Sequence, residues 1–274
     1  MNNVLVKNKT VQFKIVINLN GGLGNQMFQY AFARSLSIDL GANLYIDDTN
    51  LSGHAVTREY TLNIFKNIKK DLLVDNSRTL NLSNFESIFD DTYYENVLNS
   101  IKNEIGKFDT LFINGYFQSI KLFHNNESEI RKDFHINPIK IETDKTPVVL
   151  QVRRGDFVGN SFHEICNVDY YNKAIQKIKE LIEDPIFIII SEDTKWVSEN
   201  INFDGCEFFE NPSTTELEDY EVMLSCEYHI ISNSSFGWWP AFLSIPNVVI
   251  APNRWYANGI QSELIQPNWI TIET

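Results

Sequence analysis

The sequence lacks the features that would tie the protein to a bilayer, an oxidising compartment or a nucleic acid. It has no run of about 18 apolar residues, so we expect no transmembrane helix. Its first ten residues hold no apolar segment of the length that a secretory signal needs. Cysteine is scarce, and Cys166, Cys206 and Cys226 fit neither a zinc pattern nor a disulfide framework. The net charge of −13 opposes binding to DNA or RNA. We therefore expect a cytoplasmic protein with reduced thiols and no nucleic-acid partner.

The first part of the chain predicts the strand–helix–strand unit that begins an α/β domain. Its 274 residues, 43% of them hydrophobic, suffice for one large or two modest domains. The apolar run FKIVINLN, from Phe13, predicts a strand. Glycines follow it, then a segment with helical spacing and Gly41 at its expected C-cap, and then a second strand, NLYIDD. Residues 50–110 show weak periodicity, and beyond them LFINGYFQS predicts a strand and KLFHNNESEIRKDFHI a helix.

The second part of the chain alternates more regularly. The stretch NPIKIETDKTP, residues 137–147, is the best linker candidate, and short strands and helices alternate from there to the last apolar run, NVVIAP. Nearly all-apolar strands such as PIFIIIS indicate a parallel sheet covered on both faces. We predict an α/β fold with two facing domains, residues 1–143 and 144–274, and a ligand in the cleft beyond the carboxyl ends of the strands.

A glycine loop, NGGLGNQ, follows the first strand. It is not a complete dinucleotide fingerprint, because Met27 replaces the third glycine, although Asp47 ends the second strand as a ribose-binding acid would. No Gly-Lys-Ser/Thr follows, so it is not a P-loop either. A tight turn without a ligand and a loop whose free N–H groups face an anion remain as alternatives. The candidate ligand-binding residues of this loop are Gly22, Gly24, Asn25 and Gln26.

Charged residues follow two strands of the second part. Arg153, Arg154 and Asp156 come after PVVLQV, where paired arginines can bind an anion such as pyrophosphate. If the strand continues, the two arginines point in opposite directions, and one of them can hold Asp156 or the loop. A purely structural ion pair is the alternative. Glu192 and Asp193 follow PIFIIIS, where a carboxylate either caps the next helix or accepts hydrogen bonds from guanine.

A polar cluster opens the helix after EYHII. Hydroxyl and free N–H groups at the start of a helix can surround a phosphate. The cluster consists of Ser232, Asn233, Ser234 and Ser235. The neighbouring Trp238 and Trp239 are more typical of packing than of a ligand contact.

Together these stretches resemble the α-1,2-fucosyltransferases of glycosyltransferase family 11. Residues 21–31, GGLGNQMFQYA, match the opening motif of that family letter for letter. Its G-Y-F-Q segment is matched by residues 115–118, its H-x-R-R-G-D motif by 152–156, and its closing A-P-x-x-W-Y/F by 251–256. Its S-D-D-x-x-W and N-S-T-F-S-W-W motifs are similar to residues 191–196 and 233–239.

The resemblance implies two facing Rossmann-like domains in the GT-B arrangement, with GDP-fucose bound chiefly by the second. It implies that L-fucose moves with inversion to the 2-hydroxyl of a terminal galactose. Arg153 would bridge the diphosphate, and Asn25 would be the main side-chain contact of the glycine loop, with no metal ion or other cofactor. The acceptor would be a galactose-terminated oligosaccharide, including a lipid-linked one of a bacterial surface polysaccharide such as O-antigen. That acceptor would bring the protein to the inner face of the membrane.

Gln151 stands where the family motif has a histidine. Glutamine cannot carry a proton at neutral pH, so a general base must lie elsewhere. Asp156, His163 and Glu164 are the candidates, and a route with little base assistance is the alternative. Two further readings remain open: a transferase that uses another nucleotide sugar or linkage, and a non-catalytic protein that binds a sugar nucleotide or glycan.

Overall fold

A computed structural model of the chain describes residues 12–52, 58–71, 78–84, 89–213, 215–259 and 262–274. The N-terminal ten residues, in which we expect no secretory signal, lie outside this description. No helix in the described ranges is both long enough and apolar enough to cross a bilayer. The strands form two separate sheets, and every strand pair in both of them is parallel.

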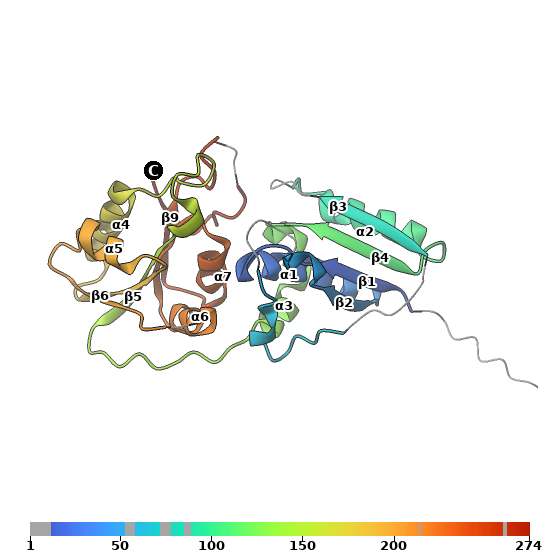
Figure 1. Cartoon of the computed structure of the whole chain (residues 1–274), viewed down its shortest axis with the longest axis horizontal. Helices are drawn as coiled ribbons and strands as arrows, with labels where there is room; N and C mark the ends of the chain where they lie inside the picture. The colour runs from blue at the N-terminus through green and yellow to red at the C-terminus, as the bar shows by residue number, and fades with distance from the viewer. Residues whose placement is uncertain (1–11, 53–57, 72–77, 85–88, 214, 260–261) are drawn as a thin grey trace, which may run out of the picture.

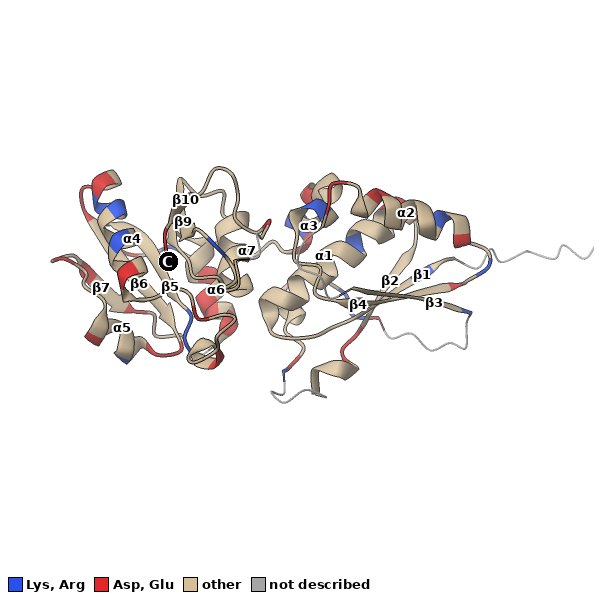
Figure 2. Ribbon diagram, turned by 90° about the horizontal axis from the view of Figure 1, so that it is seen from above, with Lys and Arg blue, Asp and Glu red and all other residues tan. Residues whose placement is uncertain are grey.

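The first sheet has four strands in the order β2-β1-β4-β3. Its strands are β1 (Lys14–Asn18), β2 (Asn43–Asp47), β3 (Thr79–Asn84) and β4 (Thr110–Gly115). The accompanying helices are α1 (Leu23–Leu40), α2 (Tyr93–Glu104) and α3 (Glu127–Asp133), which lie together on one side of the sheet (Figure 2). Short 3-10 turns occupy Thr49–Ser52, Leu62–Ile64, Ile120–Leu122 and His124–Asn126.

The second sheet has six strands in the order β10-β9-β8-β5-β6-β7. Its strands are β5 (Thr146–Val152), β6 (Pro185–Ser191), β7 (Glu207–Glu210), β8 (Tyr228–Ile230), β9 (Val248–Pro252) and β10 (Ile270–Ile272). Its helices are α4 (Val168–Leu181), α5 (Thr194–Asn200), α6 (Glu216–Leu224) and α7 (Ser235–Leu243), and a 3-10 turn spans Gly155–Phe157. The residues between Asp133 and Thr146 form neither helix nor strand and run as an extended connection between the two sheets (Figure 1).

Each sheet has one point at which the strand order reverses. In the first sheet the chain adds β2 on one side of β1, and β4 lies on the other side. In the second sheet β6 and β7 extend from one side of β5, whereas β8, β9 and β10 extend from the other. The connections leave in opposite directions at such a point, so a crevice opens beyond the strand ends, and ligands of open α/β sheets bind there.

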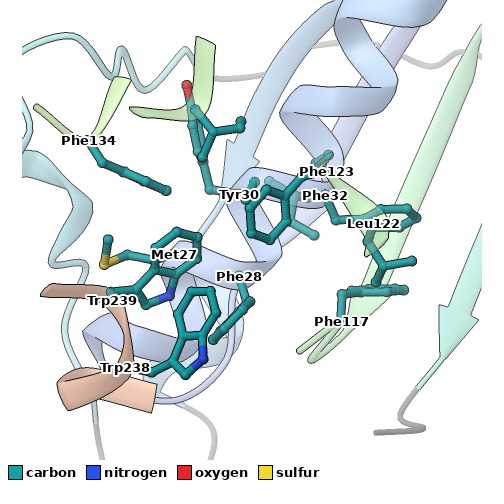
Figure 3. Packing of buried hydrophobic residues seen from close by; sticks show 14 of the residues in the cluster. Met27, Phe28, Tyr30, Phe32, Phe117, Leu122, Phe123, Phe134, Trp238 and Trp239 are labelled. Carbon is teal, nitrogen blue, oxygen red and sulfur yellow. The ribbon is translucent and has the colours of Figure 1, made fainter. Parts of the chain in front are cut away.

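We call the part of the chain that carries the first sheet the first half, and the part that carries the second sheet the second half. Helix α7 of the second half packs against the first half. Figure 1 shows it beside α1, and its two tryptophans are fully buried among aromatic rings of the first half. The ring centroid of Phe28 lies 4.8 Å from that of Trp238 and 4.7 Å from that of Trp239, and Figure 3 shows the three side chains together. The indole N–H of Trp239 donates to the carbonyl of Gly24 at 3.0 Å. The prediction that these tryptophans serve packing is confirmed, and the core that they complete is shared by both halves.

Most predicted elements are confirmed, but one predicted helix is shorter than expected, and two strands and a helix were not predicted. The helix after FKIVINLN ends at Gly41, which adopts a left-handed conformation with φ of 60°. The helix predicted over KLFHNNESEIRKDFHI is shorter, because 3-10 turns replace its first part. The missed elements are β3, α2 and β10. The four-stranded sheet pairs β3 with β4 through residues that alternate between exposed and half-buried, so the apolar signal is weak there.

Candidate functional site

A pocket of about 760 Å³ lies at the reversal points of both sheets. The first sheet lines it with residues 21–25, which follow β1, and with Tyr116 and Gln118, which follow β4. The second sheet lines it with residues that follow β5, β6 and β8. Some of the side chains that the sequence marks at separate strand ends, such as Asn25, Arg153, Glu192 and Ser235, thereby line one pocket.

Two helix N-termini meet at the wall of this pocket. The first residues of α1 and α7 both line it, and their backbones are in contact. A Cβ atom added to Gly24 would lie 2.4 Å from the carbonyl carbon of Ser235 and 2.5 Å from the backbone nitrogen of Phe236. Helix N-termini carry unsatisfied N–H groups and a partial positive charge. Two of them side by side favour an anion at this wall.

The glycine loop therefore serves packing at least as much as ligand access. Gly24 lines the pocket and also makes room for the backbone of α7, and its contact with a ligand stays a prediction. Gly21 has φ of 77°, a conformation that favours glycine. A Cβ on Gly22 would meet nothing within 4 Å, so among these three only Gly22 leaves open space at the pocket.

Arg153 lies in the pocket between two carboxylates. Its guanidinium pairs with Asp156 on one nitrogen and with Glu192 on another. Asp156 also faces Arg58 of the first half, at 3.6 Å between Oδ2 and Nη2. A guanidinium that holds two carboxylates in this way presents the fork that also binds phosphate oxygens.

Arg154 lies elsewhere and does not line this pocket. Its guanidinium covers the ring of Trp196 at 3.8 Å and its Nε lies 3.3 Å from Oδ2 of Asp193. The expectation that the other arginine holds Asp156 is wrong, because Arg153 itself pairs with that carboxylate. The strand ends at Val152, so the alternation of side chains along a strand does not apply to the two arginines.

The two acidic residues after β6 lie in different environments. Glu192 lines the pocket, whereas Asp193 does not. Asp193 is the N-cap of α5 and accepts a hydrogen bond from the backbone N–H of Trp196 at 3.2 Å. Of the two roles that the sequence allows for Asp193, the structure shows the helix cap, and the guanine contact stays a prediction.

The polar residues before α7 also differ in whether they line the pocket. Ser232 is buried and donates to Oε1 of Gln151 at 2.7 Å, outside the pocket lining. The amide of Asn233 donates to the carbonyl oxygens of His163 and Trp255, both at 2.9 Å, so this side chain holds two loops although it borders the pocket. Ser234 and Ser235 line the pocket at the start of α7, and Ser234 is the N-cap residue.

Two polar residues of the glycine loop are engaged by the protein. The Asn25 side chain lines the pocket, but its Oδ1 accepts from Gln118 at 2.6 Å and from Ser235 at 3.0 Å. Asn25 thus fixes the loop relative to β4 and α7. Gln26 is fully buried and bonds to the backbone of Gly21, Glu59 and Thr61, which corrects its assignment as a ligand contact.

Asp47 is likewise held locally. It accepts hydrogen bonds from the Asn18 side chain at 2.9 Å and from the backbone and hydroxyl of Thr49. These bonds lower the pKa of Asp47, against the opposing effect of its partial burial. The carboxylate is therefore a turn-stabilising group and not a ribose ligand.

The three candidate bases have different surroundings. His163 lines the pocket and stacks on Phe157, with ring centroids 4.8 Å apart. Partial burial lowers the pKa of His163, and the nearby Asp156 only partly opposes this shift. Asp156 is held by arginines. Glu164 is outside the pocket lining, and its carboxylate accepts from the backbone N–H of Gly159 at 2.8 Å.

Several pocket residues carry no signal that the sequence could have given. Arg58, Phe162, Glu216 and Asp219 are among the members that a motif search misses. Arg58 lies in the weakly patterned region before β3, and Glu216 and Asp219 are ordinary first-turn acids of α6. Within the described ranges, no three His, Cys, Asp or Glu side chains gather as the ligands of a metal ion would.

Comparison with known proteins identifies a family. Residues 3–273 match the model of glycosyl transferase family 11. The O-antigen biosynthesis glycosyltransferase WbnK of Escherichia coli is 30% identical over 93% of this chain and 99% of its own. An alpha-1,2-colitosyltransferase of Escherichia coli is 31% identical over 88% of this chain and 92% of its own. Galactoside alpha-(1,2)-fucosyltransferase 2 of Sus scrofa is 24% identical over 94% and 79%.

A solved structure shares the fold. The NodZ alpha-1,6-fucosyltransferase soaked with GDP-fucose superposes with a TM-score of 0.52 at 12% identity, and covers 88% of this chain and 95% of its own. At this identity the likeness concerns the fold alone, an α/β arrangement of parallel sheets.

Proposed function

The chain belongs to glycosyl transferase family 11, and from that premise we propose that it moves L-fucose from GDP-fucose to the 2-hydroxyl of a terminal galactose. The acceptor would be an oligosaccharide of a bacterial surface polysaccharide such as O-antigen, and the transfer would invert the β-linked donor to an α linkage. The observation that carries the proposal is that Arg153 and the adjacent N-termini of α1 and α7 line one pocket, which together would form an anion site.

The two halves would act as the facing domains of a GT-B enzyme. Residues 1–143 would form the acceptor-side domain and residues 144–274 the GDP-fucose-binding domain, with the donor in the cleft between them. A pocket lined from both sheets supports this division. The shared core around α7 limits how far the halves could open.

Binding of the donor would exchange partners at Arg153. Phosphate oxygens would replace the carboxylates of Asp156 and Glu192 on the guanidinium, in the same forked geometry. Ser234, Ser235 and the N–H groups at the start of α7 would hold the other side of the diphosphate. As the bond between fucose C1 and the phosphate oxygen breaks, negative charge grows on GDP, and these fixed positive groups stabilise it. The reaction would then need no metal ion.

His163 would accept the proton of the attacking hydroxyl. It lies in the pocket, and its lowered pKa keeps the imidazole neutral at pH 7, as a base requires. The other candidates are worse placed, because Asp156 would keep its ion pair with Arg58 when the donor replaces it on Arg153, and Glu164 is turned to the backbone of its own loop. Electrons of the galactose oxygen form the new bond to C1, and GDP leaves with the electrons of the old one.

Colitose is the second donor sugar to consider. The alpha-1,2-colitosyltransferase is more similar to this chain than the pig fucosyltransferase is, at 31% against 24% identity. Colitose is fucose without its 3-hydroxyl, so GDP-colitose would present the same diphosphate to the same anion site.

Donor choice is tested with the purified full chain and a panel of β-galactosides. Each acceptor is incubated with GDP-fucose, GDP-colitose or GDP-mannose, and the products are identified by mass spectrometry and NMR. We expect an α-1,2-fucosylated galactoside from GDP-fucose. Transfer only from GDP-colitose would establish the second candidate, and binding of GDP without any transfer or donor hydrolysis would indicate a non-catalytic binding protein.

A further inference from the structure

Large apolar side chains stand exposed at the mouth of the pocket. Tyr116 is 37% exposed and Phe162 is 39% exposed, and both line the pocket. They come from different halves, since Tyr116 directly follows β4 and Phe162 lies in the loop after β5. Exposed aromatic rings at the edge of a concave site are typical of surfaces that contact a ligand.

The ring of Phe162 packs against Tyr256, and its backbone is held by hydrogen bonds. Its ring centroid lies 4.9 Å from that of Tyr256 at an interplanar angle of 31°, and the Tyr256 hydroxyl reaches Gln118 of the first half at 3.4 Å. The backbone of Phe162 accepts from Ala257 at 3.0 Å and donates to Oδ1 of Asn160 at 3.0 Å. Such a ring presents its exposed surface to the pocket with little loss of freedom when a ligand binds.

Phe162 is also next to the proposed base. The centroids of Phe162 and His163 lie 4.9 Å apart, with the ring planes at 85° to each other. A sugar ring that packs against Phe162 therefore brings its hydroxyl groups to the neighbourhood of the imidazole. The anion site of Arg153, Ser234 and Ser235 borders the same pocket.

We propose that Phe162, supported by Tyr256, is the platform on which the acceptor galactose stacks, with Tyr116 at the opposite half of the pocket. This inference rests on the proposed function. In galactose the axial 4-hydroxyl leaves the C–H bonds of C3, C4 and C5 on one face, which gives an apolar patch that suits an aromatic ring. In glucose the equatorial 4-hydroxyl interrupts the corresponding patch. Phe162 would thus favour galactose over glucose as well as orient its 2-hydroxyl toward His163.

Guanine is the competing occupant of an aromatic platform. The candidate guanine-side acid, Glu192, follows β6 and pairs with Arg153, whereas Phe162 contacts His163 and Tyr256. Phe162 therefore contacts the proposed base, His163, and not Glu192, the acid that could bind guanine. The experiment separates the two occupants.

The test measures acceptor KM, turnover and GDP affinity for Phe162→Leu, Phe162→Trp and Phe208→Leu. Phe208 is the matched control, because it is 40% exposed on β7 and is not part of the pocket lining. With lactose as acceptor, Phe162→Leu should raise KM about three- to tenfold, as the loss of an aromatic contact does. Acceptor-independent hydrolysis of GDP-fucose and the Kd for GDP should stay at the wild-type values, whereas turnover with lactose should fall, because the ring no longer orients the 2-hydroxyl toward His163. Phe162→Trp should restore KM, and Phe208→Leu should match the wild type.

The outcomes are distinguishable from failure of the proposed function. If Phe162→Leu and Phe208→Leu have the same acceptor KM, the platform is overturned while fucose transfer stands. If Phe162→Leu weakens GDP as much as it weakens lactose, the ring contacts the nucleotide and the inference is also overturned. If the wild type transfers no fucose, saturation-transfer NMR of methyl β-galactoside with the GDP-loaded protein still tests whether galactose contacts Phe162. Contact at H3, H4 and H5 that disappears in Phe162→Leu would support the platform, and unchanged contact would contradict it.

Discussion

The two halves of the molecule end at one pocket but are built differently. In the second half, β5 and β6 are buried along most of their length, with helices on both faces of the sheet. In the first half, β3 alternates between exposed and half-buried residues, and the core lies mainly with α1. The halves also divide the work, because the second supplies most charged groups of the pocket and the first supplies mainly close packing.

The comparison teaches that a motif with a strong signal need not be a ligand contact. The glycine loop gives the strongest family signal, yet Gly24 faces the backbone of α7, Gln26 is buried and Asn25 is bonded to its neighbours. The short charged motif after β5 gives a weaker signal, yet Arg153 and Asp156 lie in the pocket. The predictions below separate chemistry in the second half from packing in the first.

The largest effect is expected at His163. Replacement by glutamine keeps a polar side chain but removes the proposed base, and loss of a general base typically costs about 10²–10⁴ in turnover. The pKa of His163 is lowered, so the imidazole is neutral near pH 7 and takes up a proton only on the acid side of its usual value. Wild-type turnover should therefore fall as the pH drops through that region. In His163→Gln this acid limb should be absent, and its persistence in a pH–rate profile would assign the base elsewhere.

The next largest effect is expected at Arg153. Arg153→Lys keeps the charge but loses the fork, and loss of such a stabilising donor costs about 10²–10³ in turnover. Arg154→Lys is the matched control, because Arg154 stacks on Trp196 outside the pocket. It should lower the melting temperature and leave turnover close to the wild-type value. Turnover of Arg153→Lys equal to that of the wild type would remove Arg153 from the site.

A stability effect should dominate at the glycine loop. An added methyl group on Gly24 would force α1 and α7 apart, and such overpacking costs about 1–3 kcal/mol in the free energy of unfolding. Gly22→Ser is the control, since a Cβ there meets nothing within 4 Å and serine is a favourable N-cap. Chemical denaturation measures the free energy of unfolding of both variants. If Gly22→Ser proves the more destabilising variant, the packing role of Gly24 is wrong.

A smaller effect is expected at Asp193. Asp193→Ala removes the cap of α5 and the ion pair with Arg154, so the free energy of unfolding should fall by about 1 kcal/mol. Calorimetric titration should give equal, small changes for GDP and UDP. A loss confined to GDP would instead support a guanine contact at Asp193.

The smallest effect is expected from metal removal. Because Arg153 and two helix N-termini supply positive charge at the pocket, turnover in excess EDTA should stay within a small factor of the untreated value. A complete loss that Mn²⁺ restores would contradict this.

The sequence predicted the second half better than the first for a physical reason. Strands buried on both faces, such as PIFIIIS, carry a continuous apolar signal, whereas β3 and α2 lie in polar sequence and are stabilised by neighbours distant along the chain. Arg153, Asp156, Glu192, Ser234 and Ser235 could be found because they follow strands of a parallel sheet. Arg58 and Phe162 could not, because only the folded chain brings them to the pocket.

The central claim is that the charged end of the second sheet holds the diphosphate of the donor. A crystal structure of the full chain with GDP tests it most directly. The account predicts phosphate oxygens within about 3 Å of the Arg153 guanidinium and of the N–H groups that open α7, with Asp156 released from the arginine. A diphosphate bound elsewhere, with Arg153 still paired to Asp156 and Glu192, would contradict it.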